Sequence, residues 1–218
     1  MFEKEIQEAR HTLQAIYDQL TVPGVRPEHI PLLFNTSNYR YYCEQVLQLT
    51  TGVCNFCAID VAKNEVIMEN DSWLAIRNRI APRGGQLTQI VVPLKRHIED
   101  SIDLTDKETL DQQRMYRCLR MLFGVSGSAR SIRDGDVFFN AKSMLHFHWN
   151  FHLPSGVGKV EVTFGKEPKK IEKKLPKLRI FEKMRFWAMT GVLDPWSRLS
   201  PEEFELIKED IEPPKTVG

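Results

Sequence analysis

The pattern of apolar and polar residues first predicts a helix at the start of the chain. Apolar side chains recur at three- and four-residue spacing from Phe2 to Leu20, as on one face of an amphipathic helix. Residues 22–31 hold three prolines and one glycine, which favours a linker or turn. Residues 38–50 are rich in aromatic side chains, and their pairing with the main sheet stays open.

Short apolar runs between turn residues predict strands before and after a long helix. The strands are the two halves of 65–78 on either side of Asn70-Asp71, and the runs 87–92, 136–140 and 143–154. Between the third and the fourth strand, Thr105 and Glu108 have the spacing of a capping box, which predicts a helix start. The helix behind it ends near Gly124. This order predicts an α+β fold with a mainly antiparallel sheet and one long helix.

The last of these strands carries a polar side chain at every second position. The polar residues are His146, His148, Asn150 and His152. Because successive side chains of a strand point to opposite faces, they would share one face, with large apolar residues in a core on the other. A sheet face used only for packing has no need of such a row. The row therefore indicates a functional site.

Composition and charge limit the partners and the cellular compartment expected for this protein. The net charge of +1 gives no general attraction to nucleic acid or membrane, and no apolar run approaches the ~20 residues that span a bilayer. The first residues lack the basic-then-apolar order of a secretory signal. Four cysteines, two of them in Cys54-Asn-Phe-Cys57, favour metal or redox use in a reducing compartment. We therefore expect a cytoplasmic protein.

The cysteine pair predicts a metal site. Cys54 and Cys57 are separated by two residues, which lets both thiolates reach one ion from a tight turn. A closed tetrahedral zinc site needs two further ligands, and His97 and His146 are the best candidates. Thioredoxin-like redox motifs share the spacing, but no βαβ unit follows the pair, which weakens a redox role. We predict a structural zinc ion held by these four residues.

These motifs, in this order, resemble the histidine-triad (HIT-like) superfamily. They are Cys54-Asn-Phe-Cys57-Ala-Ile, the run 90–100 around His97 with Leu104-Thr105 behind it, and Ser143-Met-Leu-His146-Phe-His148. The pattern is similar to the zinc-containing members and to the galactose-1-phosphate uridylyltransferase and dinucleoside polyphosphate phosphorylase branch. The resemblance covers residues 50–155, about half of the chain. It implies a HIT-like sheet and a nucleotide or nucleoside-phosphate substrate.

The resemblance also implies a covalent mechanism. In such enzymes the middle motif histidine, here His148, attacks the α-phosphorus of a nucleotide, since a neutral imidazole nitrogen is nucleophilic near pH 7. Its other nitrogen is held by the backbone carbonyl of His146, whose side chain is then left for zinc. The family places further contacts on the ribose (Asn78) and around the α-phosphate (Asn140 and Ser143). Apart from the resemblance, a positive charge on Lys142 would stabilise a departing phosphate. A turn-forming asparagine and a surface lysine explain Asn78 and Lys142 equally well.

Three departures from the family pattern affect the expected reaction. Asn150 stands in place of the third triad histidine. The transferase branch has glutamine there, which favours transfer or phosphorolysis over simple hydrolysis. The glycine-rich turn expected between Asn140 and Ser143 is missing, so phosphate binding is built differently or is lost. His152 is additional, and a proton donor, a phosphate ligand and a place beyond the pocket stay open for it.

Three functions are therefore compatible with the sequence. The first is a HIT-like enzyme that hydrolyses or transfers a nucleotidyl group through a nucleotidyl-histidine. The second is a zinc-stabilised nucleotide-binding module without turnover. The third is a metal-dependent hydrolase whose metal is bound by His146, His148 and His152. Many members of the superfamily are dimers, which leaves a homodimer open.

The flanks of the chain predict a three-part organisation. Residues 1–50 are an N-terminal helical extension, residues 51–155 the HIT-like catalytic domain, and residues 156–218 a C-terminal extension that packs on it. Within this tail, residues 166–185 hold nine Lys/Arg against three Glu. Such a strip is typical of a solvated helical face, and contact with phosphates stays open.

Overall fold

The computed structural model describes residues 2–78, 85–125, 127–158 and 160–211, and its contacts divide the chain into two interleaved units. The helical unit comprises Met1–Val53, Asp136–Ser143 and Gly165–Gly218. The sheet unit comprises Cys54–Gly135 and Met144–Phe164. The structure thus groups the C-terminal residues with the N-terminal helices, while the three-part organisation expected from the sequence stays a prediction.

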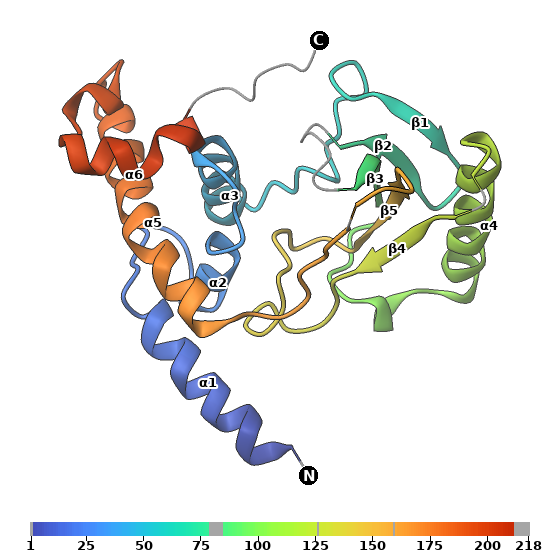
Figure 1. Cartoon of the computed structure of the whole chain (residues 1–218), viewed down its shortest axis with the longest axis horizontal. Coiled ribbons are helices and arrows are strands. Elements are labelled where there is room, and N and C mark those ends of the chain that lie inside the picture. The colour runs from blue at the N-terminus through green and yellow to red at the C-terminus, as the bar shows by residue number, and fades with distance from the viewer. Residues whose placement is uncertain (1, 79–84, 126, 159, 212–218) are drawn as a thin grey trace. The chain divides into compact units, whose positions relative to one another are not determined.

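The sheet unit is built on an antiparallel sheet, as Figure 1 shows. In the described part of the unit the strand order is β1-β2-β3-β5-β4. The bounds are β1 Val66–Glu69, β2 Leu74–Arg77, β3 Gln86–Pro93, β4 Ala129–Ile132 and β5 His148–Pro154. One long helix, α4 (Asp106–Leu122), follows β3, so the α+β class and the mainly antiparallel sheet with one long helix are confirmed.

The helix α4 covers one face of this sheet (Figure 1). It begins with the predicted capping box, in which the Thr105 side chain accepts from the backbone of Glu108 and the Glu108 side chain accepts from the backbone of Thr105. Met115 on α4 packs with Trp149 and Phe151 of β5, both fully buried. The apolar alternation along β5 therefore faces the core, as the sequence predicts, and the polar alternation faces away from α4.

Strand pairing sets which polar residues lie beside one another on the other face. Strand β5 lies between β3 and β4, with Val91 and Ser131 in register with Asn150 on its two sides. Gln89 is in register with His152. Because residues in register share a face, the central polar positions of three strands meet on the face away from α4.

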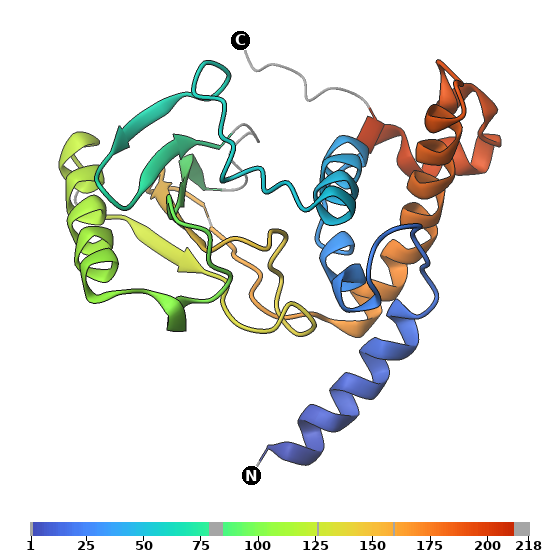
Figure 2. The ribbon, with the colours of Figure 1, turned by 180° about the vertical axis from the view of Figure 1, so that it is seen from behind.

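The helical unit consists of helices around a core of its own. Their bounds are α1 Glu3–Tyr17, α2 Ile30–Leu33, α3 Tyr39–Thr51, α5 Pro168–Met189 and α6 Pro201–Ile211, with short 3-10 helices at Pro27–His29 and Pro195–Arg198. A further 3-10 helix, Ser101–Asp103, belongs to the sheet unit. Figure 2 shows α1 extending from the other helices toward the N-terminus. Only its C-terminal end, from Leu13 to Tyr17, is buried, and there α1 contacts α5, while the Tyr17 ring packs on Phe34 and Phe138.

Several predicted elements are confirmed, and one is wrong. The helix at the start of the chain, the strands within 65–78 and 87–93, and the long helix all form. Residues 38–50 form the helix α3, whose first turn is capped by the Asn38 side chain accepting from the Tyr41 amide. The strand predicted at 136–140 does not form. Asp136 instead closes a turn: its carbonyl accepts from the amides of Phe139 and Asn140.

The fifth predicted strand is shorter than expected. Strand β5 begins at His148, and His146 lies in a bend before it. The polar row within the regular strand is therefore His148, Asn150 and His152. No helix in the described part of the chain has the length and apolar character needed to cross a membrane.

Candidate metal centre and nucleophile

Two cysteines and two histidines of the sheet unit converge on one point. Cys54 and Cys57 lie on a tight turn, in which the Cys57 amide donates to the Cys54 carbonyl at 3.1 Å. His97 lies in the loop after β3, and His146 in the bend before β5. Their donor atoms all lie within 4.8 Å of one another. Among the described residues, this is the one such group of three or more His, Cys, Asp or Glu side chains.

The spacing of these donors fits a four-coordinate metal ion. The Nδ1 atom of His146 lies 3.2 Å from the Cys54 sulfur, 3.5 Å from the Cys57 sulfur and 3.2 Å from His97 Nδ1. The Cys57 sulfur lies 3.3 Å from His97 Nδ1. Around a tetrahedral zinc ion, bonds of 2.3 Å to sulfur and 2.0–2.1 Å to nitrogen give edges of about 3.3–3.8 Å, the longest of them between the two sulfurs. The predicted ligands are therefore brought together in a suitable geometry.

The tautomer of His146 is set by a backbone group. Its Nε2 lies 2.7 Å from the Leu94 carbonyl oxygen, which only accepts hydrogen bonds. Nε2 therefore carries the proton, and the lone pair on Nδ1 points into the cluster. A metal-binding histidine commonly has such an outer partner, which fixes the ring and raises its basicity. His146 is fully buried, so this orientation is well defined.

The thiol of Cys57 is protonated when no metal is bound. Desolvation, followed by the hydrogen bond and the charge of Cys54, raises the pKa of Cys57 to about 11. Thiolates, rather than thiols, are metal ligands, so binding of an ion here releases protons.

His148 lies beside this cluster with one nitrogen held in place. Its Nδ1 donates to the His146 carbonyl oxygen at 2.9 Å. In the neutral ring the lone pair is then on Nε2. The ring of Phe56 packs edge-on against His148, with centroids 5.1 Å apart, and also against His146. An apolar wall and a fixed tautomer make Nε2 of His148 suited to nucleophilic attack.

The next two polar positions of β5 are held by amide and hydroxyl groups. Asn150 is buried, and its Oδ1 accepts from Gln89 Nε2 at 2.9 Å. His152 is buried between Gln86 Oε1, 3.1 Å from its Nδ1, and Ser131 Oγ, 2.7 Å from its Nε2. Burial, and then the charge of Arg133, lowers the pKa of His152, so the ring is neutral at pH 7.

The remaining predicted site residues are divided between the two units. Asn78 follows β2 in the sheet unit, and its backbone amide donates to the Gln89 carbonyl at 2.9 Å. Asn140, Lys142 and Ser143 belong to the helical unit. There the Asn140 side chain accepts from the Lys142 amide at 2.8 Å. Lys142 is buried, so its interpretation as a surface lysine is wrong.

The sequence did not reveal the residues that form hydrogen bonds to the predicted site residues and so fix their orientation. Gln86, Gln89 and Ser131 bond to side chains of β5, and the Leu94 carbonyl orients His146. The signal that could have found Gln89 is its place in a predicted strand, three residues before the strand ends. Its contact with Asn150 depends on the pairing of β3 with β5, which the sequence pattern leaves open.

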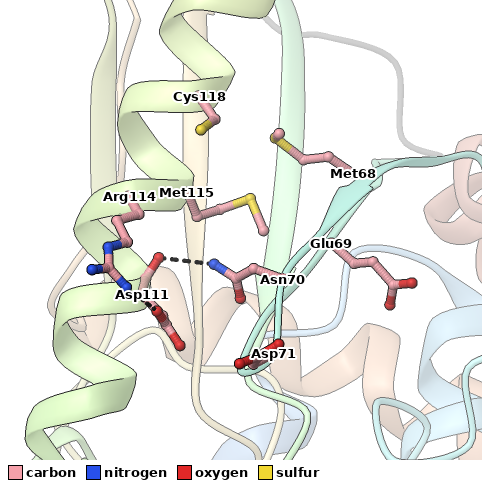
Figure 3. Close-up of a pocket in the computed structure, with 8 residues that line it drawn as sticks. All are labelled: Met68, Glu69, Asn70, Asp71, Asp111, Arg114, Met115 and Cys118. Atoms are coloured by element: carbon pink, nitrogen blue, oxygen red, sulfur yellow. Dashed lines mark hydrogen bonds and ion pairs between the residues drawn. The ribbon is translucent and has the colours of Figure 1, made fainter.

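A shallow hollow of about 300 Å³ lies elsewhere in the sheet unit, between the β1–β2 turn and α4 (Figure 3). Its wall includes Met68 from β1 and Met115 from α4. Asn70 bridges the two elements by donating to the Asp111 carbonyl at 3.0 Å. The carboxylates that line it are paired with Lys95, Lys107 or Arg114. None of the predicted site residues lines this hollow.

Comparisons with known proteins return solved structures, several of them described as HIT or histidine triad proteins. No protein-family model matches the chain, and no curated protein matches it. A HIT family hydrolase from Legionella pneumophila Philadelphia 1 is 22% identical, covers 51% of this chain and 96% of its own, and has a TM-score of 0.38. A histidine triad protein from Clostridium difficile is 22% identical, with coverages of 50% and 94% and a TM-score of 0.39. A Zn-bound histidine triad family protein from Mycobacterium smegmatis is 20% identical, with coverages of 59% and 96% and a TM-score of 0.37.

Proposed function

We propose that the sheet unit is a nucleotidyl-transferring or nucleotide-hydrolysing site in which Nε2 of His148 attacks the α-phosphorus of a nucleotide. The observation that carries this proposal is the hydrogen bond from His148 Nδ1 to the His146 carbonyl at 2.9 Å. It places the ring lone pair on Nε2 and holds the ring while a covalent bond forms there. Phe56 on one side limits the directions from which water reaches the ring.

The residues around the candidate nucleophile support charge stabilisation by neutral groups. Asn150 is next to His148 on the polar face of β5, and the Gln89 amide orients it. Neutral donors next to a reacting phosphorus stabilise negative charge that grows on its oxygens. An amide in this position also supports transfer or phosphorolysis, in which the nucleotidyl group passes to a second phosphate. The bound partner is therefore proposed to be a nucleoside phosphate.

We further propose that Cys54, Cys57, His97 and His146 hold a structural zinc ion. The mixed sulfur and nitrogen donors, the edges of 3.2–3.5 Å and the outer bond to Leu94 support zinc. All four tetrahedral positions are taken by protein donors, which is typical of structural ions. Such an ion would link the bend before β5 to the turn 54–57. It would thereby fix the position of the His146 carbonyl.

A catalytic metal on the histidine row is not supported by the geometry. The lone pair of His146 points toward Cys54 and Cys57, and both nitrogens of His152 are engaged by Gln86 and Ser131. Nucleotide binding without turnover remains the competing function, since it needs the same orienting bonds but no attack by His148.

A trapped intermediate separates these two functions. The protein is mixed with nucleotides radiolabelled at the α-phosphate, quenched in base and separated under denaturing conditions. Wild-type protein and His11→Ala, a change at an exposed histidine of α1, are expected to retain label, and His148→Ala to retain none. Nucleotide binding is measured separately as a rise in the midpoint of thermal unfolding. If the protein binds a nucleotide but never retains label, it is a binding module without turnover.

The metal is tested separately by elemental analysis. Wild type, His148→Ala and Cys118→Ala are expected to carry about one zinc ion each, because Cys118 is an exposed cysteine on α4. Cys54→Ala is expected to lose it. Retention of a full equivalent of zinc by Cys54→Ala would contradict the proposed ligand set.

A further inference from the structure

An arginine of the sheet unit carries a charge that no carboxylate of the described residues neutralises. Arg133 is half-buried and directly follows β4. Its Nε donates to the Thr163 carbonyl at 2.8 Å, and it forms no ion pair with any described residue. Desolvation alone lowers its pKa. Because an arginine stays protonated in a protein, a full positive charge is held here at a cost in desolvation.

Strand pairing directs this charge to the polar face of the sheet. Ser131 is in register with Asn150, and its hydroxyl lies 2.7 Å from His152 Nε2, so Ser131 belongs to that face. Arg133 is two residues further along, and side chains two residues apart in an extended chain point the same way. Burial, and then the charge of Arg133, lowers the pKa of His152, so the guanidinium lies within electrostatic reach of that ring. Arg133 therefore lies beside the polar row of β5.

The acid next in sequence does not neutralise this arginine. Oδ1 of Asp134 accepts from the backbone amides of Ser101 and Gly135, each at 3.0 Å. The charge of Asp134 does not act on the pKa of Arg133, and neither does that of any other described carboxylate. His152, whose pKa is lowered first by burial, is neutral at pH 7. An anion that pairs with Arg133 therefore has to come from outside the described residues.

The guanidinium has donors left for a phosphate group. Arginine has five N–H donors in a rigid plane, and the Thr163 carbonyl engages the one on Nε. That bond fixes the plane, and the donors on Nη1 and Nη2 suit parallel bonds to an oxyanion. Asn150 Nδ2 is a further, neutral donor on the same face, because Gln89 occupies the amide oxygen. A phosphate group has enough outer oxygens to accept from both residues, whereas the arginine alone satisfies a carboxylate.

From this arrangement we infer that Arg133 binds a phosphate group beside the polar row of β5. The inference goes beyond the proposed function, because it requires neither attack by His148 nor an ion at the cysteine turn. It supplies a positive charge for phosphate in a chain that lacks the glycine-rich turn between Asn140 and Ser143. Inorganic phosphate and the phosphate chain of a nucleotide offer the same chemistry to Arg133, and the experiments separate these two sources.

Arginine-selective labelling of the wild-type protein is the first test, because it needs no variant. The protein is treated with p-hydroxyphenylglyoxal in sodium phosphate, or in sodium chloride of equal ionic strength, and the labelled arginines are located by mass spectrometry of peptides. Labelling of Arg133 should slow about tenfold once phosphate reaches roughly ten times its Kd. Arg114, which is 64% exposed and paired with Asp111, should be labelled equally fast in both salts. Equal rates for Arg133 in the two salts would overturn the inference.

The second test measures the Kd of inorganic phosphate and of adenosine and uridine diphosphate by calorimetry. Arg133→Gln should weaken binding about 10–100-fold, as expected for loss of hydrogen bonds between charged groups, and Arg114→Gln should leave it unchanged.

The pattern of loss identifies the source of the phosphate. Weaker binding of the diphosphates places the phosphate chain of a nucleotide on Arg133, and weaker binding of inorganic phosphate alone indicates a site for the free anion. Unchanged affinity for all three in Arg133→Gln with a normal thermal unfolding midpoint would overturn the inference, since the arginine would then serve to anchor Thr163. Neither test uses turnover, so absence of a labelled His148 adduct would overturn the proposed covalent mechanism and leave this inference standing.

Discussion

The start of α4 offers a sharp test of how this chain is stabilised. The Glu108 carboxylate accepts two hydrogen bonds from the Arg96 guanidinium, at 2.9 and 2.8 Å, and one from the Thr105 amide at 2.8 Å. The Arg96 bonds, and then the Thr105 bonds against a cost of desolvation, lower the pKa of Glu108 from 4.5 to about 2. Glu108→Gln removes the charge while keeping an amide oxygen for the cap.

The expected loss follows from this pKa. A carboxyl group whose pKa falls from 4.5 to about 2 on folding contributes at most about 3.4 kcal/mol at neutral pH. Water screens the pair, because the Arg96 side chain is 48% exposed, so we expect about 1–2 kcal/mol at pH 7. The folded-state pKa is the lower one. The contribution is therefore complete above about pH 5 and lost as the pH falls toward 2.

Urea unfolding at several pH values measures this contribution. Replacing Trp187 and Trp196 by Phe leaves Trp73 and Trp149, both fully buried in the sheet unit, as the fluorescent reporters. Wild type should be more stable than Glu108→Gln by about 1–2 kcal/mol at pH 7, and the difference should fall to roughly a quarter of that value at pH 2.5.

A double-mutant cycle assigns the effect to the ion pair. In the Arg96→Met background, Glu108→Gln should cost much less at pH 7, because the partner charge is already gone. An equal cost in both backgrounds, or a cost that is the same at pH 7 and pH 2.5, would refute the reasoning.

Two further substitutions test the packing of the strands that carry the site. Phe151→Ala should cost about 3–5 kcal/mol in the free energy of unfolding by urea, because Phe151 is fully buried and its ring stacks on Phe123. Leu110→Ala, at a position 52% exposed on α4, should change it by less than about 0.5 kcal/mol. Gly85→Ala should destabilise by about 1–3 kcal/mol, because its Cβ would lie 2.6 Å from the Val157 carbonyl oxygen. A Cβ added at Gly127 would have no heavy atom within 4 Å, so Gly127→Ala is the neutral control. Equal midpoints of urea unfolding for the two glycine variants would contradict the close packing at Gly85.

Local patterns predicted most of the sheet unit correctly. The capping box at Thr105 and the alternation around Trp149 depend on neighbours in sequence, and both appear where expected. The convergence of Cys54 with His146 was inferred from residue chemistry and from a family resemblance, because their separation in sequence gives no geometric signal.

The wrong strand is explained by local hydrogen bonds, and the segment that the sequence left open is decided by packing in the core. Residues 136–140 have the composition of a strand, but the Asp136 carbonyl and carboxylate bind the backbone amides that a strand would have used. Residues 38–50 have aromatic side chains typical of strands, yet they pack as a helix because Tyr42 and Val46, four residues apart, meet one apolar core. The partners Gln89 and Gln86 could not be assigned before the strand order was known.

The interleaving of the two units sets the order in which they can be completed during synthesis. The sheet unit ends at Phe164, whereas the core of the helical unit needs both α1 and α5. At ribosomal rates of ~5–20 residues per second, the apolar end of α1 waits roughly ten to thirty seconds for α5 to emerge. During that interval Leu13 and Ile16 lack the partners that bury them, and they are exposed to chaperones. A nascent chain halted before residue 168 would thus carry a complete sheet unit together with an unfinished helical one.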